Sequence, residues 1–280
     1  MKKIIILSLL LFAFKAEAQK SVTFKFKYLP THNYDGTLTM GINCNVTLKG
    51  DTQIINKLKA QGISQPVVLN VSVKMNGNTK TGSPDANGIF PLVMSYKMDT
   101  LNVNVGGKAI PIPSKINSGI NIYGHVGADG KLKADSIGGS KMKDTSQQKM
   151  SQMMNSFQNM IKFPDHPMQI GDTFTQDMPF NIPMAGNNMT TNAKVVYKLV
   201  SIANGNAYFD ATQSMNMTIP IKGESMTLTG AGTGKLVYDI KNSFPVDYKS
   251  SINLTFSGKI HTLDINGTAA MDMDYKNGIN

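Results

Sequence analysis

The chain has 280 residues, one cysteine and a formal charge of +10, and every cation in it is a lysine. Its apolar fraction of 41% is enough for a folded globular protein, which excludes a disordered chain. A lone cysteine cannot form an internal disulfide, so a disulfide-stapled scaffold is excluded as well.

The first 18 residues have the composition of a secretory signal peptide. Two lysines precede the apolar stretch Ile4–Phe14, and the small-x-small sequence Ala16-Glu17-Ala18 follows it. This stretch is too short to cross a bilayer, and no other segment reaches the roughly 18 apolar residues of a span. We predict cleavage after Ala18 and export to the periplasm, the cell envelope or the medium, in preference to an N-terminal membrane anchor. Loss of three lysines and one glutamate lowers the charge from +10 to +8.

Beyond this leader, alternating apolar and polar residues predict β-strands along most of the chain. In Leu38–Leu48 every second residue is apolar, and Cys44 falls on the apolar side, which predicts a buried, unpaired thiol. Similar alternation occurs at residues 22–28, 67–75, 92–105, 195–199, 215–219, 236–240, 246–260 and 271–275. Strands with one apolar face are typical of antiparallel sheets.

Asn-Gly and Asp-Gly pairs predict the turns between these strands. They occur at positions 76–77, 87–88, 129–130, 204–205 and 266–267, and such pairs favour two-residue hairpin turns. Long antiparallel strands in a large sheet must twist and curl. We therefore predict a mainly β protein: one large curved antiparallel sheet, a half-barrel or open barrel, in a single domain over residues 19–280.

Two helices are predicted. A short one follows Asp51, a suitable N-cap, and ends at Gly62. A central amphipathic helix is predicted at about residues 144–162, where apolar residues recur at helical spacing before Pro164. Its apolar stripe consists of Met150, Met153, Met154, Phe157, Met160 and Ile161. We expect this stripe to pack on the apolar face of the sheet, either in a filled core or as a lid over a ligand.

Motifs for catalysis or metal binding are not found in the sequence. The four histidines are too far apart for a zinc site, and no Gly-x-Ser-x-Gly motif is present. The glycine-rich run 230–235 leads into a predicted strand, whereas a phosphate-binding loop leads into a helix. Without arginine or tryptophan, nucleic-acid binding is disfavoured. The sequence therefore predicts a monomeric, non-enzymatic protein with no cofactor, no metal and no nucleic-acid partner.

Methionine is the unusual feature of the composition, with 19 in the chain. Its side chain is flexible and polarizable, so one interpretation is a deformable cavity for an apolar or lipid-like ligand between the sheet and the central helix. The other is a filled core, enriched in methionine by genome composition, in a structural or interaction protein of the envelope or secretome. The sequence leaves both interpretations open.

Two segments resemble a family of uncharacterised secreted β-rich proteins of Bacteroidota. Phe163–Phe174 is similar to the family's P-x-x-P-V-x-x-G-D-x-W stretch, with Phe174 in place of the tryptophan. Gly230–Tyr248 is similar to a later stretch in which a strand follows the glycines and a second strand begins at x-P-V. A more distant, purely architectural likeness is to periplasmic lipoprotein- and lipid-carrier half-barrels. These resemblances imply an exported β-rich protein and assign no functional residues.

Overall fold

The computed structural model describes residues 21–112, 119–138, 140–141, 161–178, 181–184, 187–221 and 224–280. The predicted signal peptide and residues 144–160 of the predicted central helix lie outside this part of the chain. Ile161 and Lys162, the last residues of that predicted helix, are described and lie in an irregular segment.

Fourteen strands form a single antiparallel sheet, which confirms the prediction of a mainly β fold. The strands of the first half are β1 (Asn33–Lys49), β2 (Val67–Thr81), β3 (Phe90–Val105), β4 (Lys108–Ile110), β5 (Ile120–Val126), β6 (Leu132–Ile137) and β7 (Ser140–Lys141). Those of the second half are β8 (Thr173–Met178), β9 (Asn181–Met184), β10 (Asn187–Ala203), β11 (Asn206–Ile221), β12 (Glu224–Asp239), β13 (Phe244–Ile260) and β14 (Leu263–Ile279).

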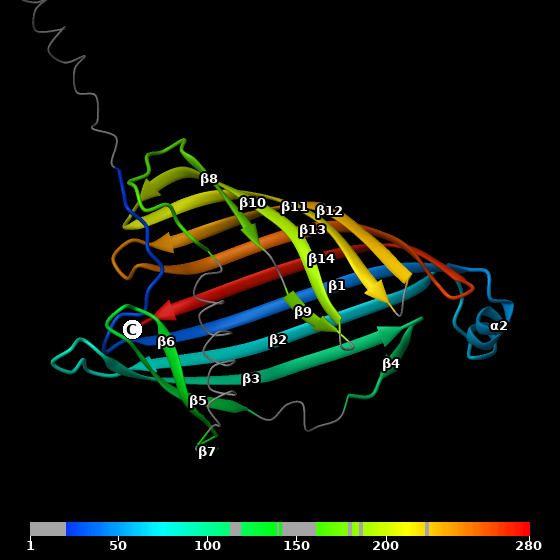
Figure 1. The fold of residues 1–280 in the computed structure, drawn as a ribbon, viewed down its shortest axis with the longest axis horizontal. Coiled ribbons are helices and arrows are strands. Elements are labelled where there is room, and N and C mark those ends of the chain that lie inside the picture. The colour runs from blue at the N-terminus through cyan, green and yellow to red at the C-terminus, as the bar shows by residue number, and fades with distance from the viewer. Residues whose placement is uncertain are drawn as a thin grey trace, which may run out of the picture.

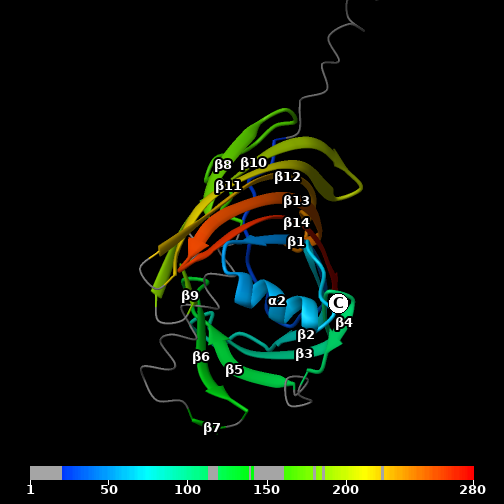
Figure 2. The same cartoon turned by 90° about the vertical axis from the view of Figure 1, so that its right-hand side faces the viewer.

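The strand order divides the sheet into two halves. It runs β7-β6-β5-β3-β2-β1-β14-β13-β12-β11-β10-β8, with β4 beside β3 and β9 beside β10 (Figure 1). Within each half the strands follow one another in chain order, apart from β4 and β9, and the pairing of β1 with β14 joins the halves. The sheet is not closed into a barrel: β7 and β8 end its path. Seen end-on, β8 and β10–β14 arch over β2, β3 and β5, so the sheet forms a trough (Figure 2).

The predicted short helix is confirmed as α2 (Thr52–Ala60), which lies at one end of the trough (Figures 1 and 2). The Asp51 side chain accepts hydrogen bonds from the backbone N–H groups of Gln53 and Ile54, at 2.9 and 3.1 Å. These bonds satisfy two of the N–H groups that a helix start leaves unpaired. They also hold the pKa of the Asp51 carboxyl below its usual value.

Two of the five predicted hairpin turns are wrong. Gly77 lies inside β2 and Gly267 inside β14, each paired on both sides. At both positions an aromatic ring of an adjacent strand occupies the space that a side chain would need. A Cβ on Gly77 would lie 3.0 Å from the Tyr96 ring, and a Cβ on Gly267 would lie 2.3 Å from the Phe256 ring. Here glycine makes room for a cross-strand aromatic side chain instead of starting a turn.

The predicted first strand, residues 22–28, is also wrong. Within it only Val22 pairs, in an isolated bridge with Met168. The remainder crosses the concave side of the sheet. There the Phe24 ring packs on the rings of Phe209 and Tyr238, with centroid separations of 5.1 and 5.2 Å. The alternation of this segment thus reflects packing on a sheet rather than membership of it.

Candidate apolar binding site

The two faces of the sheet differ sharply. In β1, residues Leu38 to Leu48 alternate as predicted, and the register places their apolar side chains beside Met75 to Val67 of β2 and Tyr275 to Ile265 of β14. The same face includes Phe209 and Tyr238, on which Phe24 packs, so it is the concave face. Along the described parts of β1, β2, β3 and β10–β14, no charged side chain occupies this face except Glu224, the first residue of β12.

One end of the trough is filled. Here the segment before β1 and the irregular segment before β8 pack on β10–β12. The buried members of this cluster are Phe24, Phe163, Met168, Phe174, Val195, Tyr197, Leu199, Ala207, Phe209, Ala211, Leu236 and Tyr238. A smaller cluster on β3, β5 and β6 lies on the other half of the sheet. This end is a conventional close-packed core.

The other end of the trough, toward α2, is only half covered. Most of its large inner-facing side chains are half-buried: Ile42, Val46, Val71, Met215, Leu228, Leu254, Phe256 and Met271. Met217 is buried and packs with Met215, Met226 and Leu228. Flexible methionine side chains therefore line part of a partly exposed apolar surface, which is the arrangement that adaptable apolar binding surfaces use.

Between the two ends lies a group of polar side chains, the Gln213 cluster: Tyr197, Gln213, Tyr248 and Ser250. Gln213 and Ser250 are each 7% exposed. The Gln213 amide donates a hydrogen bond to the Tyr248 hydroxyl, which is also hydrogen-bonded to Tyr197 and Ser250. Burial raises the pKa values of Tyr197 and Tyr248 above the ordinary value of 10.0, so their hydroxyls stay protonated well into the alkaline range.

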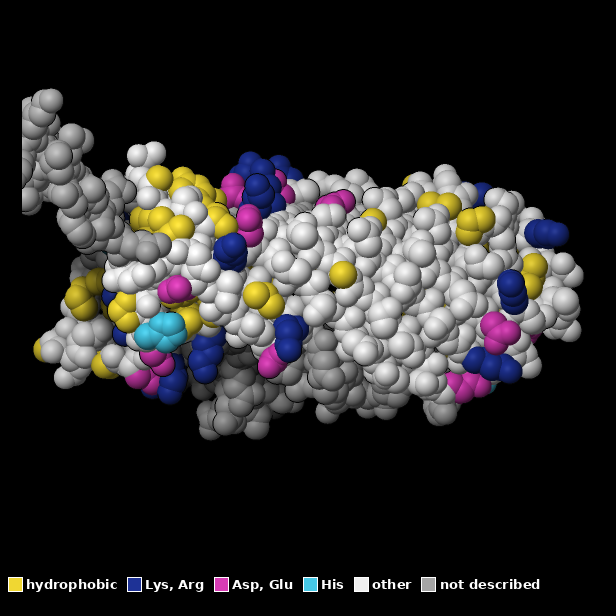
Figure 3. All heavy atoms as spheres, turned by 90° about the horizontal axis from the view of Figure 1, so that it is seen from above, with side chains coloured by type: hydrophobic (Ala, Val, Ile, Leu, Met, Phe, Trp, Pro, Cys, Tyr) yellow, Lys and Arg dark blue, Asp and Glu magenta, His cyan; other side chains and the backbone are white. Residues whose placement is uncertain are grey.

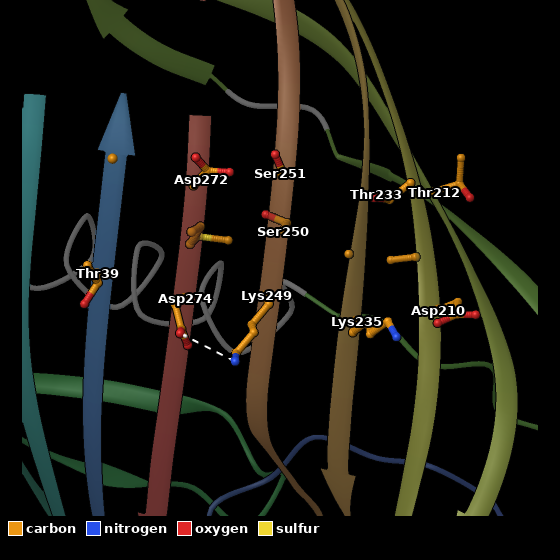
Figure 4. Close-up of a pocket in the computed structure, with 14 residues that line it drawn as sticks. Thr39, Asp210, Thr212, Thr233, Lys235, Lys249, Ser250, Ser251, Asp272 and Asp274 are labelled. Atoms are coloured by element: carbon orange, nitrogen blue, oxygen red, sulfur yellow. Dashed lines mark ion pairs between the residues drawn. The ribbon is translucent and has the colours of Figure 1, made fainter. Parts of the chain in front are cut away.

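The outer face of the sheet is polar (Figure 3). A row of side chains crosses five strands there in the order Asp210, Lys235, Lys249, Asp274 and Thr39. It borders an open groove of about 850 Å³, also lined by Thr212, Thr233, Ser251 and Asp272 (Figure 4). Lys249 and Asp274 form an ion pair at 3.8 Å, and their side chains are 57% and 42% exposed. Such exposed pairs contribute little energy, so this groove is a solvated sheet surface.

Of the six residues predicted to form a lid, only Ile161 is among those the structure describes. It is half-buried and packs against the filled end of the trough. Met150, Met153, Met154, Phe157 and Met160 lie outside the described residues.

The predicted burial of Cys44 is confirmed, and desolvation raises the pKa of its thiol. Gln213 was missed, although a polar residue between Ala211 and Met215 on the apolar side of a strand is a visible signal.

Within the described residues, no helix is long and apolar enough to cross a membrane, and no group of three or more His, Cys, Asp or Glu side chains is arranged to hold a metal ion.

No family model and no curated protein matches the chain. Three solved structures are similar over most of its length. A bacterial polysaccharide outer membrane secretin is 7% identical and covers 86% of this chain and 98% of its own, with a TM-score of 0.30. An outer membrane channel from Pseudomonas putida F1 is 7% identical and covers 90% of this chain and 98% of its own, with a TM-score of 0.23. The beta domain of the Bordetella autotransporter BrkA is 9% identical (87% and 98% covered, TM-score 0.19). These scores are too low to support any functional argument.

Proposed function

We propose that this is an exported, non-enzymatic protein that holds an apolar, lipid-like molecule in the half-open end of its trough. One observation supports the proposal above others: a continuous inner face, with Glu224 at its rim as the one charged side chain along the described parts of β1–β3 and β10–β14, is closely packed at one end and half-exposed at the other. Large apolar side chains left half-exposed side by side would gain roughly 25 cal/mol per Å² when an apolar ligand covers them. N-terminal sequencing of exported material, expected to begin at Gln19, tests the export.

The matched residues Ala269 and Ala270 allow a direct test. Ala269 faces the trough between Cys44 and Leu254, whereas Ala270 faces outward between Asn43 and Asn253. Ala269→Trp should fill the trough and abolish uptake of a fluorescent fatty-acid probe by delipidated protein. Ala270→Trp should leave uptake unchanged, because its ring lies on the solvated face.

The competing function is a structural or interaction protein with a filled core and an envelope protein as its partner. In that case wild-type protein would take up no probe, native mass spectrometry of protein from its own host would show no bound lipid, and Ala269→Trp would overpack the core and lower the melting temperature. Probe uptake by wild type that Ala269→Trp does not reduce would place binding elsewhere and contradict the proposal.

A further inference from the structure

We propose that the trough selects a neutral amphipathic ligand, such as a long-chain alcohol, and that Gln213 and Tyr248 hold its single polar group. This inference rests on the proposed function and specifies the class of ligand. It starts from an anomaly: a buried amide lies on an apolar face, at the inner limit of the half-open end.

Glycine makes the Gln213 cluster possible. Gln213 lies on β11 and Tyr248 on β13, so the amide must reach across β12. The β12 residues in between are Gly232 and Gly234, and a Cβ on Gly234 would lie 3.5 Å from the Gln213 amide nitrogen and 3.3 Å from the Ser250 Cβ. The same Cβ would lie 2.7 Å from the Lys249 carbonyl oxygen, so position 234 needs glycine, and any longer side chain there would reach into the contact between Gln213 and Tyr248.

Gln213 has hydrogen-bonding capacity to spare. A glutamine side chain offers two N–H donors and a carbonyl oxygen, and the described contacts use one donor, toward Tyr248. A ligand hydroxyl can both donate to the amide oxygen and accept from the second N–H, which matches this capacity.

The described strands around the Gln213 cluster place no cation beside it. A carboxylate or phosphate at this depth would need a cation, and every described lysine of β10–β14 is on the outer face or at a strand end. Lys235 directly follows Gly234 and Lys249 directly precedes Ser250 along their strands, so both lysines point to the opposite surface of the sheet, where they border the groove (Figure 4). Along the described parts of β10–β14 the inner face thus offers hydrogen bonds and no lysine, which favours a neutral polar group.

A competition between three ligands of equal chain length tests this inference. Delipidated protein is offered equal amounts of hexadecane, hexadecanol and palmitate at pH 8, and the retained lipids are extracted and measured. Wild type should retain hexadecanol about 3- to 10-fold over hexadecane, the range expected for a net hydrogen-bond contribution of ~1 kcal/mol, and palmitate least. Gln213→Leu and Tyr248→Phe should each bring the alcohol-to-alkane ratio close to 1 while hexadecane is still retained.

The controls separate the two proposals. Ser214→Ala, beside Gln213 but on the outer face, should retain the wild-type ratio. Tyr248→Phe removes one oxygen and keeps the ring, so it reports on the anchor if Gln213→Leu fails to fold. Preferential retention of palmitate, or an unchanged ratio in folded Tyr248→Phe, would overturn the neutral-ligand inference alone. If wild type retains none of the three lipids, the proposed function itself is wrong.

Discussion

Cys44 provides a chemical probe of the trough, because it is the chain's single thiol and lies on the concave face between Leu69 and Ala269. It is 8% exposed, and desolvation raises its pKa, so the native thiol should react slowly with a disulfide reagent at pH 8 and fast once the chain is unfolded. As a control, Cys44→Ala with Asn43→Cys moves the thiol by one residue to the outer face, where labelling should be fast. Equal native rates for the two proteins would show that the register is different.

Buried tyrosines predict the stability of the protein at alkaline pH. Desolvation raises the pKa of Tyr28, Tyr96, Tyr197, Tyr248 and Tyr275 above the ordinary value of 10.0. The unfolded chain therefore loses these protons first as pH rises, so the stabilisation is complete below pH 10 and is lost above it. The free energy of unfolding should be unaffected by these groups between pH 7 and 9 and fall steeply above pH 10.

A single variant measures the share of one tyrosine. Above pH 10, Tyr197 lowers the free energy of unfolding by about 1.4 kcal/mol per pH unit, as long as the tyrosine of the folded state stays protonated. Tyr197→Phe should make the alkaline decline shallower in urea titrations at a series of pH values. A decline of unchanged slope would mean that Tyr197 ionises equally in both states.

For single residues, the sequence predicts the properties that alternation within one strand determines. It misses the properties that depend on residues of neighbouring strands. Cys44 is predicted correctly because its own strand specifies its face. Gly77 and Gly267 are mispredicted because the rings that cover them belong to residues 96 and 256. The Gln213 cluster is missed for the same reason, since its members come from three strands.

Among the elements, β12 depends on glycine in its interior. A Cβ at Gly232 would lie 2.3 Å from the Ser251 carbonyl oxygen and 2.8 Å from Ile252, so Gly232→Ala should cost about 1–3 kcal/mol of unfolding free energy. Gly41 in β1 has no atom within 4 Å of its Cβ position, so Gly41→Ala should be neutral or slightly stabilising. Chemical denaturation of both variants checks the contrast, and equal effects would show that strand propensity rather than crowding decides.

The segment before β1 closes the filled end through Phe24, which is 1% exposed. The Tyr238 hydroxyl fixes the backbone there, because it donates to the Lys25 carbonyl at 2.6 Å and accepts from the Lys25 N–H at 3.3 Å. Phe24→Ala should destabilise the protein by about 3–5 kcal/mol, as expected for loss of a buried ring, whereas Lys25→Ala, with an exposed side chain, should stay within about 0.5 kcal/mol. Thermal melting of the pair measures the difference.

For the elements, periodicity predicts β1, β2 and β13 over most of their length, and α2 follows its cap at Asp51. Of β11, β12 and β14 it predicts only residues 215–219, 236–240 and 271–275. Residues 22–28 show the same alternation without joining the ladder, because their aromatic side chains pack on the sheet while the backbone runs across it. Periodicity alone cannot separate these two cases.

On the scale of the whole molecule, the strand order was beyond the sequence. Alternation tells which side chains share a face but not which strand lies beside which. The order within each half follows from hairpin connectivity, yet the β1–β14 pairing brings Lys49 beside Asp264, 215 positions later. The sequence thus predicts a curved sheet but not the seam between its halves, the β1–β14 pairing.

That seam has a consequence for how the chain folds. Ladders within each half form between strands that are close in sequence, whereas the β1–β14 ladder must close a loop of most of the chain, the slowest kind of contact to form. Until it closes, each half exposes the edge of a long strand that fits the other half of any copy of the chain. Refolding at high protein concentration should therefore produce domain-swapped dimers with the native β1–β14 pairing, and dilution before refolding should suppress them.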